Sequence, residues 1–182
     1  MKKIKGIIAL ALVFALVCAT AVFAADSVEL IDTSAASLDN PITYTFEDGS
    51  TIVVFDPSIK IMSRSATAPI SVAGTETLDK GSIFIPWAST TEGSDAKSGT
   101  FTVYPDDDIY VRVSPSDNEF TANTYNVALI NAENDSPLAL RQSVSFNSSV
   151  YLTTVSKKMK CYCRFSSYDG QGNASYAITA LY

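Results

Sequence analysis

The chain has 182 residues, with 13 basic and 19 acidic side chains, a net charge of −6 and no histidine. The absence of histidine excludes Ser-His and Cys-His nucleophile pairs and every histidine-ligated metal centre. The acidic excess is repelled by nucleic acid and by anionic lipid, so we expect no nucleic acid as a partner.

Residues 1–24 are typical of a secretory signal peptide. Three lysines among the first five residues precede an apolar stretch, and Ala24 supplies the small side chain required before the cleavage site. The apolar stretch is too short to favour a permanent membrane span. Cleavage would remove three basic residues and no acidic one, which moves the net charge from −6 to −9. We therefore predict a secreted, extracellular, bacterial protein that begins at Ala25 and has no stable membrane span.

The clearest local signal lies within residues 42–55, where two strand-like runs flank Asp48-Gly49. The Asp-Gly pair is favoured in two-residue hairpin turns, because both positions can adopt a positive φ. A turn centred on this pair would place Tyr44 opposite Val53, with both side chains on the same face. The sequence thus predicts a β-hairpin with this register.

The hairpin belongs to an N-terminal segment that we assign to residues 25–77. Residues 26–40 show no sustained period and are expected to form a mobile N-terminus. Residues 56–77 are rich in Ser, Thr, Ala and Pro, which is typical of a linker or a loosely packed segment, and a short strand near Ile59 or Ile70 is an additional possibility. Two interpretations stay open here: a boundary between domains, or an edge segment of a single domain.

From residue 78 onward, short runs with strand-like alternation recur at intervals typical of a sandwich. Eight runs qualify as strands: 82–85, 100–104, 109–113, 125–130, 138–146, 150–155, 159–165 and 174–181. No convincing helical period follows the signal peptide. We predict an all-β fold, with an antiparallel β-sandwich at residues 78–182 preceded by the N-terminal hairpin and the loose linker segment.

Two cysteines, Cys161 and Cys163, lie one residue apart in a predicted strand. Residues i and i+2 of a strand point to the same face, so these side chains share an apolar stripe with Met159 and Phe165. Their nearly parallel Cβ vectors are poorly placed for a disulfide. We predict two buried free thiols.

Acidic loops supply the candidate cofactor site. Asp106, Asp107 and Asp108 are consecutive, and Asp169 begins an Asp-Gly-Gln-Gly-Asn segment. Carboxylate oxygens on loops suit Ca²⁺, so calcium is the alternative to our prediction that the protein has no cofactor. Neither segment has the EF-hand spacing, which favours solvated turns as the interpretation of both.

Aromatic side chains are the remaining lead. Tyr110 and Tyr162 stand opposite the apolar stripes of their strands and could line an exposed sheet face, and Trp87 follows Pro86 in a loop. Such side chains can stack on sugar rings or contact another protein. Ordinary cross-strand packing is the alternative interpretation.

These features favour a secreted, non-catalytic binding or interaction module whose partner is an extracellular protein or glycan, for example on a cell surface. A small secreted toxin or bacteriocin-like effector is an alternative, because strands and aromatic residues fit it equally. A secreted hydrolase that uses a carboxylate pair is the third hypothesis, and the missing histidine argues against it.

Overall fold

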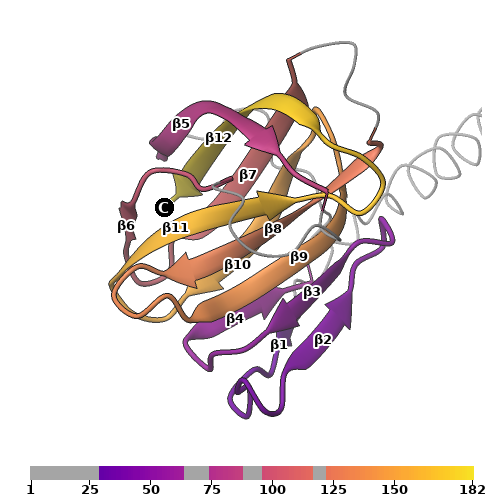
Figure 1. Ribbon diagram of the computed structural model, residues 1–182. Coiled ribbons are helices and arrows are strands. Elements are labelled where there is room, and N and C mark those ends of the chain that lie inside the picture. Colours follow the sequence, from indigo (N-terminus) through magenta and orange to yellow (C-terminus); the bar gives the residue numbers. More distant parts are fainter. Residues whose placement is uncertain (1–28, 64–73, 88–95, 117–121) are drawn as a thin grey trace, which may run out of the picture.

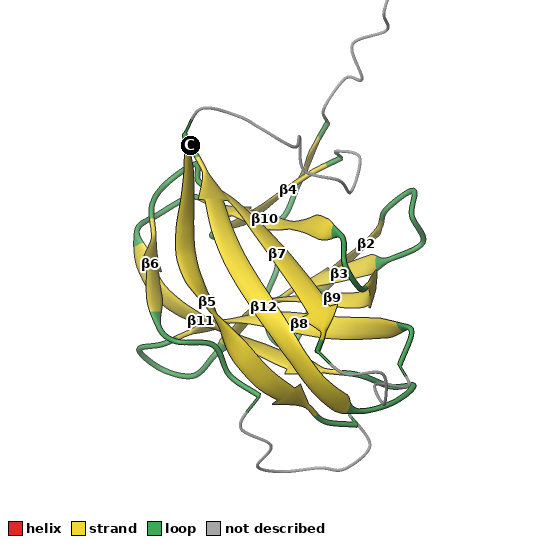
Figure 2. Ribbon diagram, turned by 90° about the horizontal axis from the view of Figure 1, so that it is seen from above, coloured by secondary structure: helices red, strands yellow, loops and turns green. Residues whose placement is uncertain are grey.

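The computed structural model describes residues 29–63, 74–87, 96–116 and 122–182 (Figure 1). The predicted signal peptide lies outside these ranges. Within them, twelve strands and no helix form two six-stranded antiparallel sheets that pack face to face. In Figure 2, β5, β12 and β7 of one sheet cross over β11, β8 and β9 of the other. The predicted all-β sandwich is confirmed.

Both sheets combine strands from distant parts of the chain. The first sheet has the order β1 (Leu30–Ile31), β4 (Ile59–Met62), β10 (Ser149–Val155), β7 (Asp108–Pro115), β12 (Gly172–Leu181) and β5 (Thr75–Ile85). The second has the order β2 (Ile42–Thr45), β3 (Thr51–Val54), β9 (Pro137–Ser145), β8 (Thr124–Asn131), β11 (Met159–Ser166) and β6 (Phe101–Val103). The eight strands predicted after residue 78 correspond to β5–β12, and β5 begins at Thr75, seven residues before the predicted start at Ser82.

The strands that precede residue 78 belong to the same two sheets. β3 pairs with β9, and β4 pairs with β10. β4 begins at Ile59, one of the two places where the expected linker segment could hold a strand, and Ile70 lies outside the described residues. Residues 29–40, the described part of the segment expected to be mobile, contact the fold: Thr33 and Ala36 are buried, and the Thr33 hydroxyl donates to the carbonyl of Ile59.

The predicted hairpin forms, but its predicted register is wrong. Tyr44 lies opposite Ile52 instead of Val53. The loop holds three residues, because the N–H of Phe46 donates to the carbonyl of Ser50, and Gly49 alone takes a positive φ, of 80°. This is a turn followed by a glycine bulge, and its extra residue shifts the pairing by one. A one-residue shift exchanges the two faces, so Ile52 and not Val53 is buried.

The inner faces of the two sheets form one hydrophobic core. On β11, the predicted stripe of Met159, Cys161, Cys163 and Phe165 faces inward and is buried. Both cysteines are free, as predicted. Burial raises the pKa of the Cys161 thiol to about 12 and raises that of Cys163 well above its usual value.

Candidate functional site

Trp87 is fixed at the end of β5 by contacts with the loop between β11 and β12. It forms a parallel bridge with Ser167, and the preceding Pro86 accepts a hydrogen bond at its carbonyl from the Ser167 N–H. The indole Nε1 of Trp87 donates to the carbonyl of Tyr168 over 2.9 Å. Although the indole is held in this way, 48% of the residue remains exposed. Trp87 therefore presents an ordered aromatic surface to solvent.

The β11–β12 loop is held by the carboxylate of Asp169. Its Oδ1 accepts from the Ser167 hydroxyl over 2.8 Å, and its Oδ2 accepts from the N–H of Asn123 over 3.0 Å. Partial burial alone would raise the pKa of Asp169. The hydrogen bonds from Ser167 and Asn123 favour the ionised form more strongly, so this pKa lies below its ordinary value of 3.8. The loop thus carries a fixed negative charge at neutral pH.

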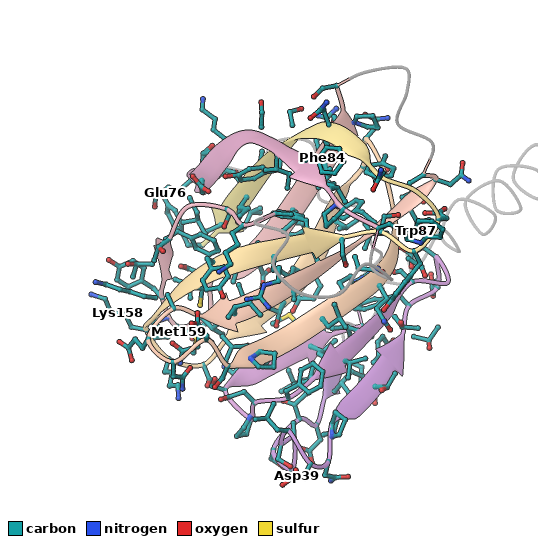
Figure 3. The ribbon with its side chains drawn as sticks, viewed as in Figure 1. Asp39, Glu76, Phe84, Trp87, Lys158 and Met159 are labelled. Atoms are coloured by element: carbon teal, nitrogen blue, oxygen red, sulfur yellow. The ribbon has the colours of Figure 1, made fainter. Side chains whose placement is uncertain are left out.

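These two features line the same open pocket. Its described lining consists of Trp87, Asp169, Gly170 and Gln171. Figure 3 labels Trp87 at the edge of the molecule, where β5 ends. Tyr168, whose carbonyl accepts the indole hydrogen bond, lies in the same loop and is 61% exposed. An aromatic face beside a carboxylate and an amide suits a ligand that has both apolar patches and hydroxyl groups.

The sequence analysis named Trp87 and Asp169 for different roles, and the structure brings them together. It missed Tyr168 and Gln171, which lie in a loop interpreted only as a tight hairpin. The signal available in the sequence was Tyr168 directly before Asp169-Gly170, because an aromatic residue in a turn is often exposed to solvent. The pairing of this loop with the end of β5 depends on the strand order, which local patterns do not reveal.

The consecutive aspartates lie at the other end of the sandwich from Asp169. β12 places Leu181 opposite Asp108 and Ala174 opposite Pro115, so residues 106–108 and the loop before β12 flank opposite ends of the β7–β12 pair.

Each of these three aspartates has its own contact within the fold. Asp106 forms an ion pair with Lys60 at 2.7 Å, and Asp107 accepts from the N–H of Tyr104. Asp108 accepts from the hydroxyl of Thr154. Among the described residues, no group of three or more Asp, Glu, Cys or His side chains could hold a metal ion. Calcium stays a hypothesis from the sequence, and no described cluster supports it.

The expectation that Tyr110 and Tyr162 line an exposed sheet face is wrong. Both side chains point outward in the strand alternation, yet the two residues are only 3% and 6% exposed. The Tyr110 ring packs edge-on against Tyr151, with 5.7 Å between ring centroids. Tyr162 lies beneath the cationic groups of Lys97 and Arg164.

Comparison with known proteins gives no further guidance, since no family model, curated protein or solved structure matches the chain. None of the described segments forms a helix with the length and apolar character needed to cross a membrane.

Proposed function

We propose that the protein is an exported, non-catalytic binding module, and that its ligand is a glycan held against the indole of Trp87. The observation that carries the proposal is the half-exposed indole, which its Nε1–H bond ties to the loop that supplies Asp169 and Gln171. A sugar ring has an apolar C–H face that packs on an indole and hydroxyl groups at its edge. These two parts match the two kinds of surface in the pocket.

The hydrogen bonds within the site support the proposal, because they reduce the entropic cost of binding. The indole and the loop are ordered before any ligand arrives. The Asp169 carboxylate accepts hydrogen bonds from Ser167 and Asn123, and each carboxylate oxygen can accept more than one hydrogen bond, which allows a hydroxyl group of the ligand to donate to it. The chain contains no histidine that could act as a general base at neutral pH, and this favours binding over catalysis.

A glycan array probed with the purified secreted protein tests the pocket. We expect Trp87→Ala to weaken binding of the selected glycan by at least about tenfold, as loss of an aromatic anchor typically does. Trp87→Phe should retain part of the affinity, because it keeps a ring and loses only the Nε1–H bond. Tyr182→Ala is the control, since Tyr182 is exposed at the end of β12 that lies away from the pocket loop. Binding that survives Trp87→Ala unchanged refutes the proposal.

Export is tested separately by intact-mass measurement of protein recovered from the culture medium. We expect the recovered chain to begin at Ala25 or Asp26. A retained N-terminal segment, or an added lipid mass, contradicts this part of the proposal.

A further inference from the structure

The outward side of β11 carries a row of cations. Residues at alternate positions of a strand face the same side, and the inward set on β11 is the buried apolar stripe described above. The outward set consists of Lys158, just before the strand, followed by Lys160, Tyr162 and Arg164. All three cationic side chains are exposed. With a rise of about 3.3 Å per residue, the row from Lys158 to Arg164 is about 20 Å long.

A fourth cation, Lys97, joins the row from the neighbouring segment. Lys97 bridges to Arg164, and the Lys97 ammonium and the Arg164 guanidinium lie 5.4 and 5.9 Å from the ring centroid of Tyr162. Arg164 also donates to the Tyr162 hydroxyl, which in turn donates to Asp135. The tyrosine thus forms a floor that holds two cations in place beside one carboxylate.

Among the residues that the structure describes, no carboxylate forms an ion pair with a cation of the row. The ion pairs found among the described residues are Lys60–Asp106 and Arg141–Asp48, and neither involves the row. This is notable in a chain with 19 acidic and 13 basic residues. A linear group of exposed cations is complementary to a linear anion.

The row leads towards the pocket. β11 ends at Ser166, and the next residue, Ser167, is bridged to Trp87. Figure 3 shows Lys158 and Trp87 on opposite sides of the molecule, with β11 running between them. A chain-like ligand that lies along the row can therefore reach the indole.

We propose that Lys97, Lys158, Lys160 and Arg164 bind the anionic part of the ligand, and that the ligand is a linear acidic glycan with carboxylates repeated along its chain. This inference rests on the proposed function, which places a sugar ring at Trp87. A nucleic acid is the other linear anion that such a row could attract, and the oligonucleotide in the test below distinguishes it from the glycan.

The test uses polygalacturonate as the probe and its methyl ester as the matched ligand, which has the same sugar chain without the charge. The test variant is Lys160→Glu combined with Arg164→Glu. The control is Lys80→Glu combined with Arg112→Glu, which makes the same change in net charge. Lys80 and Arg112 are exposed and both flank Ala177 on the other sheet. Thermal unfolding should show that both double variants fold.

We expect the test variant to bind polygalacturonate at least about tenfold more weakly than wild type at low salt, and the control to stay within about twofold. Wild type should bind the methyl ester more weakly than the acid. Equal binding of acid and ester, or a test variant that behaves like the control, overturns the inference. Equally tight binding of a single-stranded DNA oligonucleotide to the same row overturns the glycan as its occupant.

The Trp87→Ala variant separates this inference from the proposed function. If polygalacturonate binding responds to the row variant but not to Trp87→Ala, the row is supported and the pocket is refuted. If it responds to Trp87→Ala but not to the row variant, the pocket is supported and the row is refuted.

Discussion

Arg141 and Ser50 meet inside the sandwich, where Nε and Nη2 of Arg141 donate to the Ser50 hydroxyl oxygen over 3.1 and 2.6 Å. Ser50 donates in turn to Asp48 in the hairpin loop. Arg141 is fully buried, and its Nη1 donates to the carbonyl of Tyr151 in the opposite sheet. Its guanidinium carbon lies 3.5 Å from the ring centroid of Phe46. One buried cation therefore connects both sheets and the β2–β3 hairpin.

Asp48 should stabilise the fold through Arg141. Burial lowers the pKa of Arg141 to about 10, although the Asp48 charge opposes this shift, so the guanidinium is charged at neutral pH. Asp48→Asn keeps the side-chain oxygen that accepts from Ser50 but removes the counter-charge, which lies 3.6 Å from Nη2. We expect a loss of about 1 kcal/mol in the free energy of unfolding, because Asp48 is partly exposed and solvent screens the pair.

A double-mutant cycle isolates this interaction. Arg141→Met should lower the free energy of unfolding by about 3 kcal/mol, because it removes the buried hydrogen bonds to Ser50 and Tyr151. In the Arg141→Met background, Asp48→Asn should leave the free energy of unfolding almost unchanged. The coupling energy between the two side chains, measured by urea unfolding, should therefore be about 1 kcal/mol. If Asp48→Asn costs the same in both backgrounds, the two side chains act independently.

Strand alternation predicted where β9 lies but not that it carries a buried charge. Arginine is almost never fully buried without partners, so its position in a strand pattern normally indicates a solvent face. Its partner Ser50 is 91 residues away in the sequence. The hairpin loop that brings Ser50 into place contains one residue more than the Asp-Gly pair indicated. Local patterns therefore located the strands, and the buried contact depended on tertiary packing.

In the candidate site too, local patterns predicted some features and tertiary packing determined the others. The outward direction of Tyr162 followed from the alternation on β11, but its burial depends on contact with Lys97, which lies 65 residues earlier in the sequence. The pocket joins Trp87 to Asp169 through a bridge between β5 and the β11–β12 loop. Each residue type indicated its chemistry in the sequence, whereas the sheet order decided which residues meet.

Gly49 should be required for the register of the hairpin. Its φ of 80° lies in the left-handed region, and a Cβ at this position would meet no atom within 4 Å. A substitution therefore tests backbone strain alone. Gly49→Ala should lower the free energy of unfolding by about 1 kcal/mol, whereas Gly49→Asn should cost less, because asparagine tolerates this conformation. Chemical denaturation measures both. A neutral Gly49→Ala would show that the glycine bulge is not needed.

Cys161 and Cys163 should not react with thiol reagents in the native protein. Both are fully buried, and burial raises the pKa of each thiol, so the reactive thiolate is scarce. In the chain that begins at Ala25, a colorimetric disulfide reagent at pH 8 should label both thiols only as fast as the protein unfolds. Ser156→Cys, at an exposed position, is the control and should react at once. Rapid labelling of the unmutated chain would place at least one thiol within reach of solvent.

Asp169 should stabilise the pocket loop in a pH-dependent way. Partial burial opposes its charge, but the hydrogen bonds from Ser167 and Asn123 lower its pKa below the ordinary 3.8. The folded state therefore binds this proton more weakly than the unfolded state. The stabilisation is complete above the ordinary pKa and is lost as the pH falls through the lower folded pKa. Asp169→Asn should thus reduce the free energy of unfolding by less than about 1 kcal/mol at pH 7 and at pH 5, and the difference from wild type should shrink below about pH 4.

Urea unfolding at pH 7, 5, 3.5 and 2.5 measures this difference in the free energy of unfolding. Asp39→Asn is the control, because Asp39 is at an exposed loop position away from Trp87 (Figure 3). A difference that stays constant down to pH 2.5 would mean that the Asp169 charge contributes nothing to the loop.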